Sequence, residues 1–265
     1  MKIIDQSVEI ITESNPLKRI ELVGRVCWKS EHRITEDSAK PFVAGLIKRG
    51  HTSPLEHARV VVPRDNKSFM MYSINEPYGY RDRRRKTYKN GRVCADVVNV
   101  RDLWNMSHYP NHENEFVSEV EKLENSDDYM TVKFITDIGM SRELIRHRQM
   151  SFMELSTRYV NYKDGIEFIK PEWYTHKHWG EQHVFEATIL KIENQYKCLI
   201  ERGFKPQEAR AILPLCTKTE LYMTGMLSQW KDVFALRESP AAHPQMRALM
   251  ALLREEMKKN NIEVK

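Results

Sequence analysis

The sequence predicts an α+β fold, with an antiparallel or mixed sheet flanked by helices and a helix-rich C-terminal half. Several segments space their apolar residues three and four positions apart, as amphipathic helices do. Residues 58–62 and 129–135 have instead the β-branched or alternating composition of strands. The chain of 265 residues carries neither an internal repeat nor a low-complexity tract. We therefore expect a single domain over residues 1–265.

The N-terminal part is predicted to begin with two helices. Apolar residues follow near-helical spacing over 15–28, and Asn15-Pro16 provides a cap followed by an N1 proline. Residues 38–48 show the same pattern and are followed by Gly50, which favours a helix end. The strand over 58–62 ends at a proline, and we expect it to pair with the strand over 129–135.

Residues 64–128 are interpreted as an insertion between these paired strands. Helical spacing within the insertion predicts helices over 97–104 and 113–123. The insertion also contains a basic cluster, 80–89, in which arginines and lysines are bracketed by tyrosines. Such a cluster favours a solvated loop or a subunit contact, although it is also typical of a segment that stacks on nucleic-acid bases.

The C-terminal half is predicted to be mainly helical. We expect a helix from Thr136 through Arg148, an irregular crossing, and a strand over 166–169. Helical spacing resumes over 181–202 and stops near Gly203, and a further helix starts at Pro206.

Composition excludes several classes of protein. With 41% hydrophobic and 30% charged residues, the chain is typical of a globular protein, and no window approaches the ~20 apolar residues of a membrane helix. The N-terminus lacks the features of a signal peptide, so we expect a cytoplasmic protein. Widely scattered cysteines predict reduced thiols and neither a zinc site nor a disulfide scaffold. They are Cys27, Cys94, Cys198 and Cys216.

The most informative segment is 146–159, which we call the central motif. It contains Arg146, Arg148 and Arg158 together with a histidine, a glutamate and several hydroxyl groups. Guanidinium groups match phosphate or carboxylate bidentately, and converging guanidiniums repel one another unless an anion lies between them. The motif therefore predicts a phosphorylated ligand, in agreement with the net charge of +5.

The order Arg146-His147-Arg148, seven residues, Ser156 and then Arg158-Tyr159 resembles the signature of flavin-dependent thymidylate synthases. A second segment of the chain, 50–57, resembles that family's Gly-His-x-Ser/Thr segment before a strand. A third resemblance covers the C-terminal part, where four short segments occur in the same order as in the family. These segments are 207–214, 218–220, 236–237 and 241–245.

The resemblance implies an enzyme that methylates C5 of dUMP to give dTMP. It implies FAD reduced by NADPH, with 5,10-methylenetetrahydrofolate as the carbon donor. It also implies a homotetramer with active sites between subunits, in which one chain supplies the motif and another supplies Arg210 or Arg237.

The resemblance further implies a role for each matching residue. Arg237 would face the pyrimidine ring as the catalytic cation, because a cation there stabilises charge that develops on N3 and the carbonyl oxygens. Ser156 is expected to bind nucleotide, not to act as a nucleophile. Cofactor contacts are expected from His51, Ser53, Glu56, Arg146, His147, Arg148, Glu154 and Asp232. Substrate contacts are expected from Glu143, Arg146, Glu154, Leu155, Ser156, Thr157, Arg158, Arg210 and Arg237. The spacing of His51, Glu56 and His57 does not fit a zinc helix, so no metal is expected.

The chain departs from the family pattern at a few positions. Many members have an amide where this chain has Met153, and Asn and Arg where it reads Met226-Leu227-Ser228 and neighbouring residues. These departures leave open a related reaction, such as C5 hydroxymethylation or action on another pyrimidine monophosphate. The basic cluster 80–89 also leaves open a function outside the enzymes, namely nucleic-acid binding. We do not expect nucleic acid as the ligand.

Overall fold

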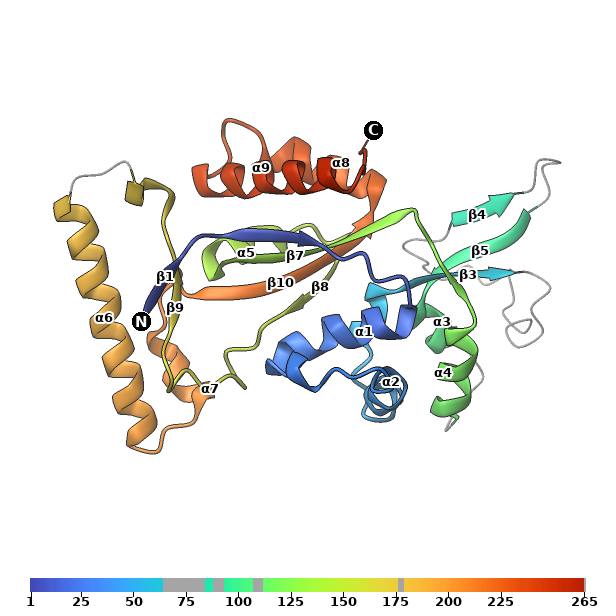
Figure 1. Cartoon of the computed structure of the whole chain (residues 1–265), viewed down its shortest axis with the longest axis horizontal. Helices are drawn as coiled ribbons and strands as arrows, with labels where there is room; N and C mark the ends of the chain where they lie inside the picture. The colour runs from blue at the N-terminus through green and yellow to red at the C-terminus, as the bar shows by residue number, and fades with distance from the viewer. Residues whose placement is uncertain (64–83, 88–92, 107–111, 176–178, 265) are drawn as a thin grey trace. The chain divides into compact units, whose positions relative to one another are not determined.

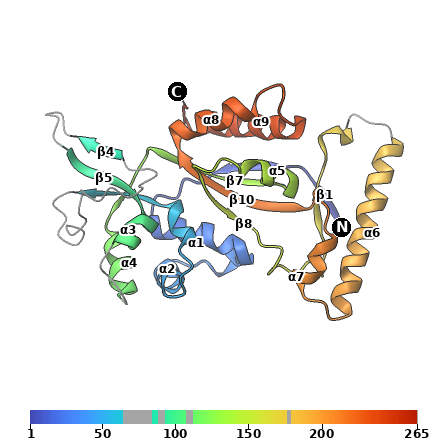
Figure 2. The same cartoon turned by 180° about the vertical axis from the view of Figure 1, so that it is seen from behind.

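The computed structural model describes residues 1–63, 84–87, 93–106, 112–175 and 179–264, and its elements are shown in Figures 1 and 2. The chain forms two compact units. Unit 1 comprises residues 1–11, 26–29 and 132–265, and unit 2 comprises residues 12–25 and 30–131. The mixed fold class with antiparallel sheets is confirmed, since helices and antiparallel strand pairs occur in both units.

A four-stranded sheet with the order β2-β7-β10-β8 forms the centre of unit 1. Its strands are β2 (Ser7–Ile10), β7 (Tyr129–Asp137), β10 (Lys218–Met226) and β8 (Ser151–Glu154). β2 pairs with β7 and β8 pairs with β10, both antiparallel. Every residue of β10 is buried, because this strand lies inside the sheet and is covered on both faces.

Helices of unit 1 cover this sheet. Figure 1 shows α8 and α9 along one side of it, where α8 packs on β10 and α9 on β2. Unit 1 contains the helices α5 (Ile138–Leu144), α6 (Trp179–Glu201), α7 (Pro206–Ala209), α8 (Leu227–Arg237) and α9 (Pro244–Lys259), of which α6 packs on α7 and not on this sheet. The core between them includes Trp230 and Phe134, whose ring centroids lie 6.3 Å apart.

Beside α6, the strands β1 (Lys2–Ile4) and β9 (Glu167–Ile169) form a parallel pair. The buried carboxylate of Glu193 on α6 fixes this pair. It accepts hydrogen bonds from the amino group of Met1 at 2.9 Å and from the backbone N–H of Ile166 at 3.1 Å. Burying this carboxylate is tolerated because it is paired and hydrogen-bonded. Strand β9 confirms the strand that was predicted over 166–169.

Unit 2 combines helices with a second antiparallel sheet of order β4-β5-β3-β6. The strands are β3 (Arg59–Pro63), β4 (Arg84–Thr87), β5 (Val93–Asn99) and β6 (Glu124–Asn125). The helices are α1 (Pro16–Arg25), α2 (Ala39–Lys48), α3 (Val100–Met106) and α4 (Glu113–Glu121). Their apolar faces share one core, which includes Leu17, Ile20, Val43, Leu46, Leu55, Val60, Leu103 and Phe116.

The structure corrects four sequence predictions. β3 pairs with β5 and β6 instead of β7, so residues 64–128 supply strands to the sheet of β3. Residues 97–99 belong to β5, and helix α3 begins only at Val100. The predicted helix over 136–148 is shorter, since β7 continues to Asp137 and α5 ends at Leu144. The crossing through the central motif contains strand β8.

Some predictions concern residues outside the described part of the chain. Of the basic cluster 80–89, only 84–87 are described, as the backbone of β4. Cys27, Cys198 and Cys216 are free thiols, whereas the side chain of Cys94 lies outside the described residues. Within the ranges given above, no helix is long and apolar enough to cross a membrane.

Candidate functional site

The guanidinium of Arg237 joins two elements of unit 1 at the start of the central motif. Arg237 lies at the end of α8, donates from Nη1 to the Glu143 carboxylate at 2.8 Å, and donates again to the Glu143 carbonyl. Its Nε donates to Nε2 of His147 at 3.0 Å. Arg237 therefore contacts both Glu143 and His147. Arg237, Glu143 and His147 are called the Arg237 cluster below.

Burial and neighbouring charges shift the pKa values of His147 and Arg237. Burial lowers the pKa of His147, and the neighbouring Arg237 charge lowers it further, while Asp232 acts in the opposite direction. Burial also lowers the pKa of Arg237, and the Glu143 carboxylate counteracts this. An arginine nevertheless keeps its proton in proteins. A neutral imidazole therefore accepts from a charged guanidinium, which lies next to a carboxylate.

Local contacts hold the first part of the motif against β10 and α8. Asp137 caps α5 by accepting from the backbone N–H of Met140 at 2.7 Å. Gln229 donates to the carbonyl of Gln149 at 3.2 Å. The buried Met150 side chain packs over Gly225, where an added Cβ would lie 2.0 Å from the Met150 Sδ. Gly225 is therefore required by this close approach.

Strand β8 carries the middle of the motif. Glu154 accepts from the hydroxyl of Thr219 on β10 at 2.9 Å. Met153 is buried, and its Sδ lies 3.0 Å from the Sγ of Cys27. Burial and the Glu154 carboxylate raise the pKa of Cys27 to about 11, so this thiol stays protonated at neutral pH. Leu155 is buried and donates its backbone N–H to the carbonyl of Glu220 at 2.9 Å.

A second cluster follows β8, where the motif turn meets α7 and the short helix after it. Arg210 donates from Nη1 to the hydroxyl of Thr157 at 3.3 Å, and Arg158 donates from Nε to the side-chain oxygen of Gln207 at 3.3 Å. The hydroxyl of Ser156 accepts from the backbone N–H of Arg158 at 3.3 Å. These five residues are called the Arg158 cluster.

The arginines of the Arg158 cluster have neutral side-chain partners. Arg158 and Arg210 are exposed, and their side-chain partners are a neutral amide and a neutral hydroxyl. Arg146 and Arg148 are exposed as well. Among the described residues, no carboxylate forms an ion pair with any of these four arginines. Their charge remains available for a phosphate or carboxylate ligand.

The two clusters lie at opposite ends of β8. The Arg237 cluster precedes the strand and the Arg158 cluster follows it. Four strand residues rise roughly 13 Å, at about 3.3 Å per residue. Strand β8 therefore lies along the chain between Arg146 and Arg148 on one side and Arg158 on the other, whereas Arg158 and one of Arg146 or Arg148 were expected to bind one phosphate.

The remaining predicted residues lie elsewhere. His51 and Ser53 are exposed in unit 2, at the start of the short helix η3 (Ser53–His57). Glu56 in the same helix forms an ion pair with Arg101. Asp232 is an exposed residue of α8 whose charge acts on His147. Within the described ranges, no group of three or more His, Cys, Asp or Glu side chains is arranged to hold a metal ion.

Gln207 contacts Arg158, although no role for Gln207 was predicted from the sequence. A detectable signal was present, because Gln207 precedes Arg210 by three residues at the start of a helix. Residues three apart on a helix project from the same face. Gln207 and Arg210 therefore both reach the motif turn.

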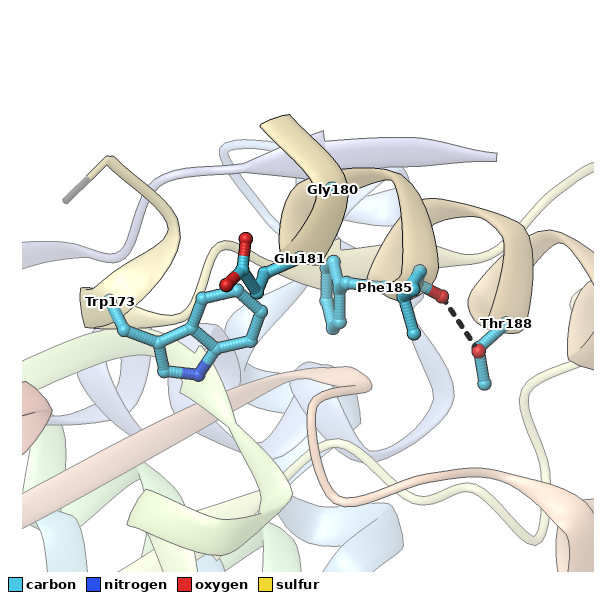
Figure 3. A pocket seen from close by; sticks show the side chains of 6 residues that line it. Trp173, Gly180, Glu181, Phe185 and Thr188 are labelled. Carbon is cyan, nitrogen blue, oxygen red and sulfur yellow. Dashed lines mark hydrogen bonds between the residues drawn. The ribbon is translucent and has the colours of Figure 1, made fainter. Parts of the chain in front are cut away.

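A pocket of about 740 Å³ lies apart from both clusters, between α6 and the short helix η5 (Glu172–Thr175) (Figure 3). Trp173 and Phe185 line it with their rings edge to face at 5.8 Å. The hydroxyl of Thr188 donates to the carbonyl of Val184 at 2.7 Å, the bond dashed in Figure 3. None of the predicted site residues lines this pocket.

Both clusters lie within the part of the chain that matches a known family. Residues 127–260 match the family described as thymidylate synthase complementing protein. The flavin-dependent thymidylate synthase of Mycobacterium tuberculosis (strain ATCC 25618 / H37Rv) is 31% identical over 131 residues, which cover 44% of this chain and 52% of the relative. The probable flavin-dependent thymidylate synthase of Paramecium bursaria Chlorella virus 1 is 28% identical over 127 residues, with coverages of 42% and 57%. The chain spans about half the length of the curated relatives it matches.

Proposed function

The chain belongs to the thymidylate synthase complementing protein family, and from this premise we propose that it is a flavin-dependent thymidylate synthase. It methylates C5 of dUMP to give dTMP. The observation that carries this proposal is the pair of clusters at the two ends of β8. One cluster presents exposed guanidiniums to a phosphate, and the other holds a guanidinium beside a neutral imidazole.

The donor set fits a flavin dinucleotide and a nucleotide monophosphate. Arg146 and Arg148 are exposed and, within the described residues, free of carboxylate partners, which suits the pyrophosphate of FAD. His147 contributes a planar ring beside them. Bound FAD, reduced by NADPH, would supply a hydride, and 5,10-methylenetetrahydrofolate would supply the one-carbon unit. We assign further cofactor contacts to His51, Ser53, Glu56, Glu154 and Asp232.

We assign the phosphate of dUMP to the Arg158 cluster. The guanidiniums of Arg158 and Arg210 bind its oxygens, and the hydroxyls of Ser156 and Thr157 add hydrogen bonds. We also assign substrate contacts to Glu154 and Leu155, at the adjoining end of β8, and to Arg146, which precedes the strand. Because Gln207 is neutral, it orients Arg158 without cancelling the positive charge.

We assign the pyrimidine ring to Arg237. A cation that faces the ring stabilises negative charge as it develops on N3 and the carbonyl oxygens. Glu143 and His147 hold the planar guanidinium in one orientation, so that little reorganisation is needed when charge develops.

We also propose active sites between subunits, since the two clusters lie on either side of β8 along the chain. We propose that Arg237 or Arg210 of one copy completes the site of another, in a homotetramer. We further propose that residues 1–265 work as one domain with an insertion at 64–128, and that the protein acts in the cytoplasm.

Product analysis tests the proposed reaction. Purified protein is incubated with FAD, NADPH, 5,10-methylenetetrahydrofolate and dUMP, and the nucleotide product is analysed by mass spectrometry. The expected product is dTMP. A product heavier than dTMP by one oxygen would show C5 hydroxymethylation instead. An absorbance spectrum of freshly purified protein measures flavin independently, and a protein that takes up neither FAD nor dUMP contradicts the proposal.

A further inference from the structure

Trp28 lies beside the Arg158 cluster, although neither its sequence position nor its spacing had pointed to a site. It ends the short helix η1 (Val26–Trp28), and its ring centroid lies 6.0 Å from that of Tyr159, with 31° between the planes. Trp28 is 39% exposed and Tyr159 is 52% exposed. Two large aromatic rings therefore reach the surface together, next to the motif turn.

Backbone contacts fix the position of this aromatic pair. Ser156 donates its N–H to the carbonyl of Cys27 at 3.3 Å, which ties the motif turn to η1. Lys29 then adopts a left-handed conformation with φ of 50°, and its N–H donates to the carbonyl of Val26 at 3.1 Å. A left-handed backbone is uncommon for a residue other than glycine. These backbone hydrogen bonds hold Trp28 next to Tyr159.

Positive charge lies next to the aromatic pair. The Arg158 guanidinium carbon lies 5.4 Å from the centroid of the Tyr159 ring. Arg210 reaches the same turn through Thr157. Aromatic faces beside guanidiniums with neutral partners match a ligand that joins a planar heteroaromatic ring to a phosphate, because the ring stacks while the phosphate binds the cations.

We propose that Trp28 and Tyr159 form a stacking platform for the heteroaromatic ring of a phosphate-bearing ligand whose phosphate binds Arg158 and Arg210. This inference rests on the proposed function, and it deepens it by adding Trp28 as a binding residue. The test uses two ligands with the required chemistry, dUMP and FAD. Their separate affinities distinguish which ring occupies the platform.

Binding measurements on the full chain test the platform. The dissociation constants for dUMP, FAD and inorganic phosphate are measured by titration calorimetry for wild type, Trp28→Ala, Trp28→Phe and Trp173→Ala. Trp173 is the matched control, since it is 36% exposed and lines the separate pocket beside α6. Inorganic phosphate reports the arginines alone, because it carries no ring.

The stacking platform predicts a specific pattern of dissociation constants among the variants. Trp28→Ala raises the dissociation constant for dUMP or FAD roughly 5- to 100-fold, the range of single-ring stacking contributions. Trp28→Phe keeps a ring and stays within about threefold of wild type. Phosphate affinity is unchanged in both variants, and Trp173→Ala binds all three ligands as wild type does. The ring ligand with the larger loss is the one that occupies the platform.

Other outcomes overturn the inference. It fails if Trp28→Ala binds both ring ligands as wild type does, if phosphate binding falls equally, or if the variant changes the assembly mass in sedimentation, which would make Trp28 a subunit contact. If Trp28→Ala does not fold, tryptophan fluorescence decides. Ligand-induced quenching should be smaller in Trp28→Phe, and undiminished quenching refutes the platform. A wild type that binds neither dUMP nor FAD refutes the proposed function as well, whereas binding without dependence on Trp28 refutes the platform alone.

Discussion

Arg237 donates from Nε to Nε2 of His147 across 3.0 Å, although 90 residues separate them in the chain. This bond requires an imidazole whose Nε2 carries no proton. Burial and the Arg237 charge both lower the pKa of His147, so the neutral form is favoured in the folded protein. The central motif and α8 are therefore coupled through one protonation state.

The first prediction concerns turnover. Arg237→Ala removes the cation that we assign to the pyrimidine ring, and we expect the turnover number to fall by about 100-fold or more. The protein should still fold, because the exchange exposes Glu143 to water instead of burying it without a partner. Steady-state kinetics and circular dichroism measure the two effects. The control is Arg254→Ala, which breaks an ion pair of similar length with Glu238, where both side chains are 38% exposed. Undiminished turnover in Arg237→Ala would show that the assigned role is wrong.

The second prediction is a pH dependence of stability. The pKa of His147 in the folded protein lies below its ordinary value of 6.5, so the unfolded state binds more protons between these two values. The contribution of His147 to the free energy of unfolding is thus complete above pH 6.5. It is lost as the pH falls through the pKa that His147 has in the folded protein.

Urea unfolding between about pH 5 and pH 8 measures this contribution. The free energy of unfolding should decrease toward acid pH in wild type, and the decrease should be smaller in His147→Gln. His32→Gln replaces an exposed histidine and serves as the control. The prediction is contradicted if His147→Gln retains the full wild-type slope.

The third prediction concerns phosphate affinity. Gln207→Glu places a carboxylate where an amide oxygen now accepts from Arg158 at 3.3 Å. The new ion pair competes with an anionic ligand, and we expect the dissociation constant for dUMP to rise several-fold. Added salt should reduce the difference, because salt screens exposed charges. Gln195→Glu adds the same charge at an exposed position of α6 and controls for net charge. Equal losses in both variants would argue against a specific contact.

The fourth prediction concerns packing under the motif. Gly225→Ala brings a Cβ to 2.0 Å from Sδ of the buried Met150, so this side chain must move. We expect the free energy of unfolding to fall by about 1–3 kcal/mol. Adding Met150→Ala should recover part of that loss, which a double-mutant cycle measures as non-additivity. At Gly180 an added Cβ meets no atom within 4 Å, so Gly180→Ala should not destabilise the protein. Strict additivity of the two motif substitutions would refute the proposed clash.

Local patterns in the sequence were sufficient for the amphipathic elements. Apolar spacing predicted α2 and α6 nearly to their ends, because a helix that packs on one face repeats every three to four residues. The same reasoning missed β10. Both faces of this strand are buried, so its residues do not alternate, and it carries Lys218 and Glu220, which are buried as an ion pair. Polar residues in that pattern do not indicate a strand until their partners are known.

By itself, the sequence identified the family and the cationic central motif, and it predicted a phosphorylated ligand, because these depend on residue types at short spacing. Only the tertiary structure decided that Arg237 contacts Glu143 and His147, that Gln207 contacts Arg158, and that the two clusters lie at opposite ends of β8. It also decided that β3 pairs with β5 and not with β7. Contacts between residues far apart in the chain depend on how complete elements pack, and short-range periodicity carries no information about that packing.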